Sequence, residues 1–154
     1  MRLLDYLDEN LIFLNLEAKD KDDAFEKIVA LMVQNQALQH PHDFLAALRH
    51  RESLGSTAIG EGIAMPHARL KDLKRIIIVC ACLKKGIDFD AEDQKPVNLI
   101  FLLSTPLAMA TEYLQVLAKL SRFLKEKDIP NKLLKAGSPA ELIEIIDETE
   151  CGFK

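Results

Sequence analysis

Two nearly continuous apolar runs restrict the fold of this chain more than any other feature. Residues 75–83 and 97–103 contain almost only Ile, Val, Leu, Phe, Ala and Cys. A strand with one wet face alternates apolar and polar residues, whereas an uninterrupted run is typical of a strand covered on both faces. The two runs therefore predict central strands of a sheet with helices packed on its faces, an α/β architecture.

Helical patterns lie before and after these strands. Asp20 can cap a helix that follows a short strand at 11–16, and Pro41 suits the first turn of a second helix. We predict a turn at residues 84–86. After residue 103 only helices are expected, the last of them beginning with a capping box at 138–141. Four leucines at helical spacing are predicted to face the core: Leu114, Leu117, Leu120 and Leu124.

Length and charge are typical of a soluble domain. The 154 residues are 49% hydrophobic and carry a net charge of −4, so we predict one domain spanning residues 1–154. The scattered basic residues argue against nucleic acid or an anionic membrane as a partner. Neither apolar run approaches the roughly 20 residues that cross a bilayer. Asp5, Asp8 and Glu9 interrupt the amino-terminal segment, which argues against an export signal and predicts a cytoplasmic protein.

The three cysteines make an odd count. Cys80 and Cys82 are two residues apart in a predicted strand, so their side chains point to the same face and pack there as small hydrophobic groups. We predict that all three cysteines are reduced.

Residues 51–69 have the composition of an anion site. Glycines let backbone N–H groups point toward an anion, hydroxyl groups donate hydrogen bonds, and guanidinium groups offer paired donors. The residues of these three kinds are Gly55, Gly60 and Gly62, then Ser53, Ser56 and Thr57, then Arg51 and Arg69. A single histidine, His67, lies among them directly after Pro66.

The segment does not have the pattern of a nucleotide site. Gly55 and Gly60 have the outer spacing of a P-loop, but Glu61 and Gly62 stand where Lys and Ser or Thr are required. A dinucleotide fingerprint fails as well, because Met65 replaces its third glycine. We therefore expect no cofactor.

His67 is the natural carrier of an anion in this segment. The imidazole of an unperturbed histidine has a pKa of about 6.5, so it is largely neutral and nucleophilic near neutral pH. It can attack a phosphoryl group and later release it, while surrounding donors stabilise the transferring oxygens. Spacing alone leaves a plainer interpretation open, namely an ordinary hydrogen-bonded histidine in a turn.

The other histidines do not favour a metal site. His40 and His42 flank Pro41 at a helix start, and neither a cysteine nor a third histidine stands at ligand spacing. We predict that both are solvated cap residues, that His50 lies on an exposed helix face, and that the chain binds no metal. A metal-dependent or hydrolytic enzyme is disfavoured for the same reason.

A longer motif joins the residues of the anion site: Arg51-Glu-Ser-x-Gly-Ser-Thr57-Ala-Ile-Gly60-x-Gly62-Ile-Ala-Met-Pro66-His67. It closely resembles the signature of the fructose/mannitol-type enzyme IIA domains of the bacterial phosphoenolpyruvate-dependent phosphotransferase system. The resemblance extends to residues 86–90, to 96–103 and to the carboxy-terminal leucine-rich helix. It implies a single mixed β-sheet flanked by α-helices on both faces.

The resemblance also implies a phosphotransferase component. In that family the motif histidine, here His67, takes a phosphoryl group from the histidine-containing phosphocarrier protein, which enzyme I charges from phosphoenolpyruvate. The same resemblance assigns Arg51 to the phosphohistidine pocket and Thr57 to its support. Further candidates for the phosphate pocket are Ser56, Gly60, Glu61, Gly62 and Arg69.

Two positions depart from the family pattern. Many members carry Asn where this chain has Glu61, and a carboxylate there repels a phosphate unless it points away or pairs with an arginine. Transport-type members tend to have a second pocket histidine, and the best-aligned residue here is Tyr113. We predict Tyr113 as a site residue whose phenol can donate one hydrogen bond but cannot become cationic.

Three roles remain open at this point. We favour a regulatory, nitrogen-type IIA whose phosphorylation state controls its binding to other proteins. The alternatives are a sugar-uptake IIA that passes phosphate to a IIB cysteine, and a protein-binding regulator that is not phosphorylated. In each case we expect partners to dock on apolar and small residues around His67, without insertion of this chain into a membrane.

Overall fold

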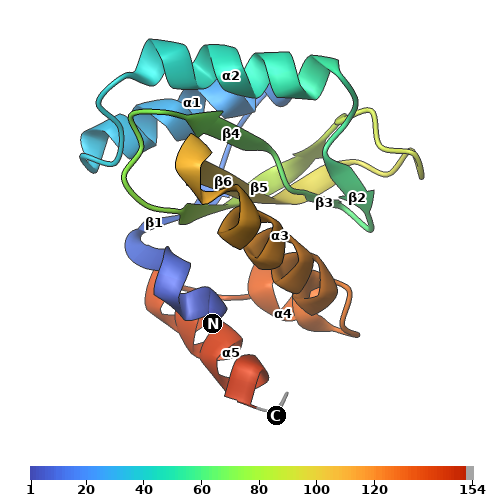
Figure 1. Ribbon diagram of the computed structural model, residues 1–154. Helices are drawn as coiled ribbons and strands as arrows, with labels where there is room; N and C mark the ends of the chain where they lie inside the picture. Colours follow the sequence, from blue (N-terminus) through green and yellow to red (C-terminus); the bar gives the residue numbers. More distant parts are fainter. Residues whose placement is uncertain (152–154) are drawn as a thin grey trace.

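The centre of the sheet is formed by β5 (Ile77–Ile87) and β6 (Val97–Pro106), which contain the two apolar runs. A computed structural model describes residues 1–151 of the chain (Figure 1). β5 and β6 pair antiparallel, and most of their residues are buried. The prediction of central strands is confirmed. Residues 84–86, which we predict as a turn, instead continue β5 with an irregular register between Cys82 and Ile87.

Four further strands complete the sheet. β1 (Leu7–Leu16) lies parallel to β5. β3 (Ile63–Ala64) and β4 (His67–Leu70) both lie parallel to β6, and β2 (Ala58–Gly60) is antiparallel to β3. The strand order is β1-β5-β6-β3-β2, with β4 as an additional partner of β6. The mixed sheet that the resemblance implies is therefore confirmed.

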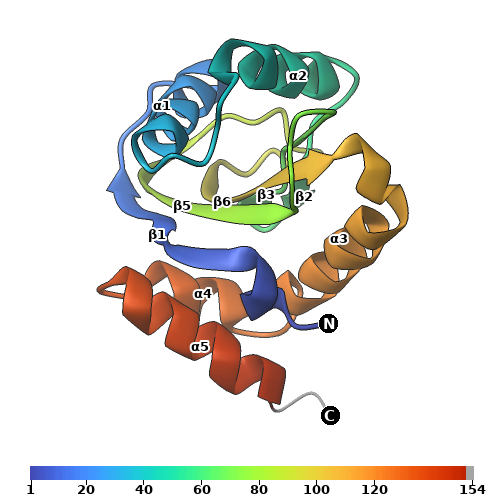
Figure 2. The same ribbon diagram turned by 60° about the vertical axis from the view of Figure 1, so that its left-hand side comes forward.

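Helices cover both faces of the sheet, as predicted (Figures 1 and 2). α1 (Lys21–Gln34) and α2 (Pro41–Ser53) cover one face, and their apolar residues share a core with Val79, Ile100 and Leu102. The other face is covered by α3 (Ala110–Leu124), α4 (Ile129–Leu134) and α5 (Pro139–Cys151). Short 3₁₀ turns, η1 (Leu3–Tyr6) and η2 (Leu107–Met109), precede β1 and α3.

The helix starts follow the capping residues in the sequence. The Asp20 carboxylate accepts a hydrogen bond from the Asp23 N–H at 2.8 Å, and Pro41 is the first residue of α2. The Ser138 hydroxyl accepts from the Glu141 N–H at 3.1 Å. These contacts satisfy N–H groups that have no partner within their own helix.

The leucine stripe on α3 differs from its prediction. Leu120 and Leu124 are buried, but Leu117 is only partly buried and Leu114 is 60% exposed. Tyr113 takes the core position instead. Adjacent helical residues are about 100° apart, so a face that buries Tyr113 turns Leu114 toward solvent.

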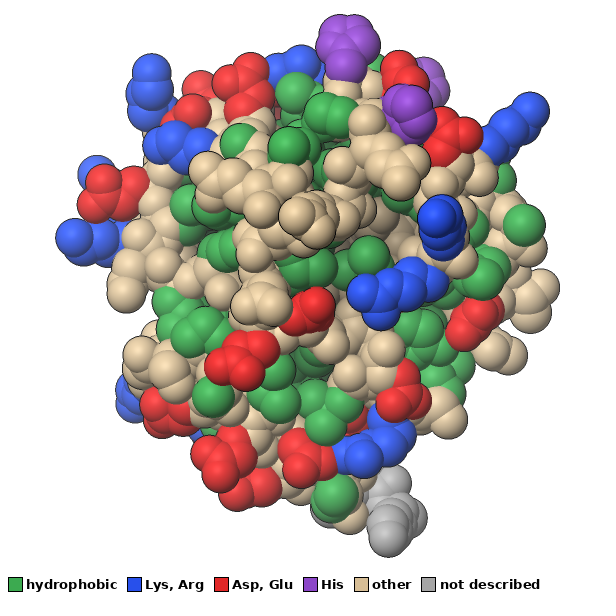
Figure 3. Space-filling view, turned by 90° about the vertical axis from the view of Figure 1, so that its left-hand side faces the viewer, with side chains coloured by type: hydrophobic (Ala, Val, Ile, Leu, Met, Phe, Trp, Pro, Cys, Tyr) green, Lys and Arg blue, Asp and Glu red, His purple; other side chains and the backbone are tan. Residues whose placement is uncertain are grey.

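The remaining sequence expectations concern the cysteines and the surface. Cys80 and Cys82 are buried on the face covered by α3 to α5, and all three cysteines are free thiols. Acidic and basic side chains are interspersed on the face shown in Figure 3. Within residues 1–151, no helix combines the length and apolar character that crossing a membrane requires.

Candidate functional site

His67 is the first residue of β4 and lies where that strand begins to pair with β6. Its register partner on β6 is Leu103, whose N–H donates to the Pro66 carbonyl at 2.9 Å. Arg51, in the last turn of α2, reaches across and donates from Nε to His67 Nε2 at 3.2 Å. The Arg51 Nη1 donates to the Gly55 carbonyl at 2.9 Å, which holds the guanidinium in place.

The Arg51 contact defines the tautomer of His67. Because Nε2 accepts a hydrogen bond, it carries a lone pair, and the proton of the neutral ring resides on Nδ1. Nδ1 faces the Met65 carbonyl at 3.4 Å. Burial lowers the pKa of His67, the Met65 carbonyl opposes this shift, and the nearby Arg51 and Arg69 charges lower the pKa further. The site therefore presents a neutral imidazole with a nucleophilic Nε2.

Tyr113 and Arg69 form the other side of this site. The rings of His67 and Tyr113 are 5.4 Å apart between centroids, and the Arg69 Cζ lies 5.3 Å from the Tyr113 centroid. The Arg69 Nη2 also donates to the Leu107 carbonyl at 3.3 Å. Burial raises the pKa of Tyr113, so its hydroxyl stays protonated near neutral pH. The structure thus brings together four predicted residues: Arg51, His67, Arg69 and Tyr113.

The three predicted hydroxyl residues bind the scaffold rather than the imidazole. The Ser53 hydroxyl donates to the His50 carbonyl within α2 at 2.5 Å. The Ser56 hydroxyl donates to the Phe89 carbonyl at 2.5 Å. The Thr57 hydroxyl and N–H donate to the two carboxylate oxygens of Glu52, at 2.5 and 2.9 Å. Ser56 and Thr57 thus hold the turn between α2 and β2 in place.

The structure does not bring Gly60, Glu61 and Gly62 to His67. Glu61 and Gly62 have φ angles of 57° and 79°, as the two-residue turn of a β-hairpin requires, and they connect β2 to β3. The Gly62 carbonyl accepts from Leu99 N–H at 3.1 Å, whereas His67 pairs with Leu103. Four residues of strand at ~3.3 Å each separate these levels, roughly 13 Å along β6.

The side chain of Glu61 is likewise occupied elsewhere. Its carboxylate pairs with Lys95 at 3.1 Å, and its N–H donates to Asp93 at 2.9 Å. From the sequence, this carboxylate is expected to repel a phosphate unless it points away or pairs with an arginine. The structure shows that it points away and pairs with a lysine.

Glu52 belongs to the sequence motif, but our sequence analysis assigned it no role. It is only 8% exposed, and besides Thr57 its carboxylate binds Lys21 Nζ at 3.2 Å. Its spacing in the sequence could have indicated that it is buried, because Phe44, Leu48 and Glu52 follow one another at intervals of four residues on the buried side of α2. A charged residue that continues an apolar stripe needs buried partners.

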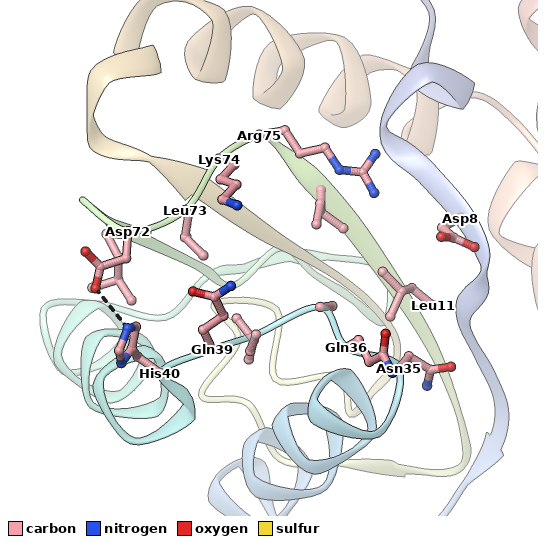
Figure 4. A pocket seen from close by; sticks show the side chains of 14 residues that line it. Asp8, Leu11, Asn35, Gln36, Gln39, His40, Asp72, Leu73, Lys74 and Arg75 are labelled. Carbon is pink, nitrogen blue, oxygen red and sulfur yellow. Dashed lines mark ion pairs between the residues drawn. The ribbon is translucent and has the colours of Figure 1, made fainter.

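A hollow of about 270 Å³ lies at the other end of α2 (Figure 4). It is lined mainly by the loop between α1 and α2 and the loop between β4 and β5, and the side chains of His40 and Asp72 approach each other to 3.6 Å at its edge. His42 and His50 are exposed on α2. Among residues 1–151, no three His, Cys, Asp or Glu side chains are grouped to hold a metal ion.

The fold and the site together define a class of protein. A mixed sheet flanked by helices presents an imidazole with an unprotonated Nε2 and two arginines near it at the start of a strand, and these are the groups that a protein needs to carry a phosphoryl group on histidine. Residues 5–149 match the family model described as "Phosphoenolpyruvate-dependent sugar phosphotransferase system, EIIA 2". The chain belongs to this family.

Similar proteins include both regulatory and sugar-specific ones. A "Nitrogen regulatory protein" of Bradyrhizobium diazoefficiens is 34% identical over 143 residues, 93% of this chain and 92% of the relative. The "PTS system fructose-specific EIIABC component" of Bacillus subtilis is 31% identical over 148 residues, 96% of this chain but 23% of that protein. The crystal structure of Nitrogen Regulatory Protein IIA-Ntr from Neisseria meningitidis superposes with a TM-score of 0.85 at 34% identity, covering 92% of this chain and 97% of that chain.

Proposed function

We propose that the chain is a phosphoryl carrier whose His67 Nε2 accepts a phosphoryl group from the histidine-containing phosphocarrier protein. The observation that carries this proposal is the 3.2 Å hydrogen bond from Arg51 Nε to His67 Nε2. This hydrogen bond supports Nε2 as the unprotonated nitrogen of the neutral ring, with a guanidinium close to the phosphoryl oxygens on which negative charge would develop during transfer.

The chemistry needs no metal or base from this chain. As the donor approaches, the Arg51 N–H leaves the Nε2 lone pair and turns to a phosphoryl oxygen. The new N–P bond then forms at Nε2 while the N–P bond of the donor phosphohistidine breaks, and no proton has to leave Nε2. The ring gains positive charge as it is phosphorylated, and its Nδ1–H faces the Met65 carbonyl. Arg51 and Arg69 supply positive charge for the phosphoryl oxygens, which is the main requirement of such transfers. We expect no turnover of a small molecule by the chain alone.

Exposed leucines near the site support transfer between proteins. Leu54 is 72% exposed, Leu107 is 42% exposed and Leu114 is 60% exposed. Leu54 follows Arg51 by three residues, the Leu107 carbonyl binds Arg69, and Leu114 adjoins Tyr113 in α3. Such an apolar rim fits a transient protein partner that brings its own histidine to Nε2.

The relatives favour a regulatory, nitrogen-type role, and we propose that the protein performs it in the cytoplasm. The similar nitrogen regulatory proteins share nearly their whole length with this chain. The fructose-specific relative supports the second candidate, a sugar-uptake IIA that passes phosphate to a IIB cysteine. Mixing the phosphorylated chain with IIB domains separates the two, since only the sugar-uptake role predicts rapid loss of the label to a cysteine.

The direct test is intact-mass analysis after incubation with phosphoenolpyruvate, enzyme I and the phosphocarrier protein. We expect one acid-labile phosphoryl group on the wild type, none on His67→Ala, and one on the control His50→Ala, whose side chain is exposed on α2. Label retained by His67→Ala would refute the assignment.

An unlabelled wild type, with donors verified as active, would favour the third role, a regulator that is not phosphorylated. Tyr113 is then the residue to revert, because the structure places it beside His67 and places Glu61 elsewhere. A gain of label in Tyr113→His, and none in Glu61→Asn, would locate the defect at the second-histidine position.

A further inference from the structure

We infer that Glu52, held by Thr57 and Lys21, is a positioning residue that sets the Arg51 guanidinium against His67. This inference rests on the proposed function, since it assigns Glu52 a role in phosphoryl transfer to Nε2. Glu52 does not touch the imidazole; it acts through the turn that carries the second partner of Arg51.

The first step is the burial of the carboxylate. Glu52 and Thr57 are 8% and 5% exposed, so an unpaired charge here would be costly. The Glu52 oxygens accept from the Thr57 hydroxyl, the Thr57 N–H and Lys21 Nζ, at 2.5, 2.9 and 3.2 Å. Charge-assisted hydrogen bonds of this kind are stronger than neutral ones, and they fix the geometry of both partners.

The second step is the fastening of the turn between α2 and β2. Thr57 binds Glu52 and so holds the carboxy-terminal end of the turn, and the Ser56 hydroxyl donates to the Phe89 carbonyl at 2.5 Å. Lys21 ties the same site to the loop after β5, because its Nζ also binds Asp90 at 3.2 Å and lies 4.9 Å from the Phe89 ring centroid. The network therefore joins α1, α2 and two loops.

The third step leads from the turn to the reacting nitrogen. The Gly55 carbonyl, within the fastened turn, accepts from Arg51 Nη1 at 2.9 Å, and Arg51 Nε donates to His67 Nε2 at 3.2 Å. Arg51 and Glu52 are neighbours in α2, about 100° apart around the helix, so one side chain reaches the imidazole while the other anchors the turn. The Lys21 ammonium also offsets the negative charge of Glu52, which by itself raises the pKa of His67 and so favours its protonated form.

The test combines an isosteric variant with a double-mutant cycle. Thr57→Val removes the hydroxyl donor at constant shape, and Thr57→Ser keeps it. We expect Thr57→Val to slow phosphoryl transfer about 10- to 100-fold, as displaced catalytic groups do, and Thr57→Ser to restore it. In an Arg51→Ala background, Thr57→Val should cause no further loss. The matched control is Glu26→Gln, an exposed carboxylate that pairs with Arg49.

NMR titration of His67 in the unphosphorylated protein gives an independent readout. The Arg51 charge helps to lower the His67 pKa, so a displaced guanidinium should raise it in Thr57→Val and leave it unchanged in Thr57→Ser. The hydrogen bond between Arg51 and His67 is present in the unphosphorylated protein, so the titration tests the positioning role even if the wild type takes up no label. An unlabelled wild type would refute the proposed function without deciding the positioning role.

Two results would overturn the inference. One is unchanged transfer and an unchanged His67 pKa in Thr57→Val. The other is a slowing in Thr57→Val that persists undiminished in the Arg51→Ala background, which is the behaviour of a merely structural contact. If Thr57→Val fails to fold, Glu52→Gln replaces it in the same cycle, because an amide keeps one acceptor for Thr57.

Discussion

Residues 51–69 have the composition of an anion site throughout, but in the structure they form two separate regions along β6. We call these regions the histidine end, where the two flanks of the segment meet, and the hairpin end, which contains its middle. At one end, Arg51 and His67 meet through a 3.2 Å hydrogen bond. At the other end, Gly60 to Gly62 form a hairpin turn whose only charged side chain pairs with Lys95. Pairing with β6 separates the two ends. The comparison teaches that anion-binding composition indicates a site only where the fold gathers its donors around one atom.

Removal of the Arg51 guanidinium from the histidine end should have the largest effect of all the changes on the rate of phosphoryl transfer. We expect Arg51→Ala to slow phosphoryl transfer about 10²- to 10³-fold, because it removes a donor preorganised at the reacting nitrogen. Arg51→Lys should recover little, since a lysine cannot reproduce the guanidinium fork that contacts both Nε2 and the Gly55 carbonyl. Single-turnover labelling followed by mass analysis measures the effect. Transfer at the wild-type rate in Arg51→Ala would remove Arg51 from the mechanism.

The hairpin end should respond in stability rather than in transfer. Gly62 has a φ of 79°, and an added Cβ would lie 3.0 Å from the Asn98 amide oxygen. We therefore expect Gly62→Ala to lower the free energy of unfolding by about 1–2 kcal/mol. Urea denaturation checks this value, and labelling under conditions where the variant stays folded should match the wild type. A folded Gly62→Ala with slow transfer would contradict the separation of the two ends.

A smaller effect is expected from pH at the histidine end. Burial lowers the pKa of His67, so labelling should remain full as the pH falls to about 6.5, the ordinary pKa of a histidine, and decline only below it. The folded state binds fewer protons than the unfolded state between the lowered pKa and this ordinary value. This contribution to stability is present above about pH 6.5 and is lost as the pH falls. Comparing urea denaturation of wild type and His67→Ala across this range isolates it; identical pH profiles would show that the His67 pKa is not lowered.

The smallest effect is expected from the charge in the hairpin turn. Glu61→Asn should leave transfer unchanged, because the wild-type carboxylate is bound to Lys95 and its hairpin turn lies beside the start of β6, far from His67. Loss of this ion pair should cost less than about 1 kcal/mol, since the Glu61 side chain is 77% exposed and solvent screens it. The same labelling and denaturation assays apply. Faster transfer in Glu61→Asn would show that the carboxylate acts on the site after all.

Particular residues show which features of the fold can be predicted from the sequence. Asp20, Pro41 and Ser138 mark the starts of helices correctly because capping depends on neighbours within a few residues. The apolar runs place β5 and β6 at the centre because burial on both faces leaves no polar alternation. The prediction that Leu114 faces the core was wrong, because the exact buried face of a helix depends on what it packs against.

Some features of the candidate site can likewise be predicted from the sequence, and others cannot. His67 and its flanking glycines are visible in the sequence, and the longer motif relates them to a family. The sequence does not reveal that Glu52 anchors the turn behind Arg51, since its partners Lys21 and Thr57 come from separate segments. It also does not reveal which donors of the motif face the imidazole.

By itself, the sequence determined the strand and helix types, the two central strands and the histidine with its arginine. Only the tertiary structure decided that Arg51 meets Nε2, that Tyr113 lies beside the ring, and that Glu61 belongs to a distant hairpin. The physical reason is the range of the interactions. Propensity, capping and burial patterns act over a few residues, whereas strand register and buried ion pairs depend on backbone and side-chain partners that the fold brings from far along the chain.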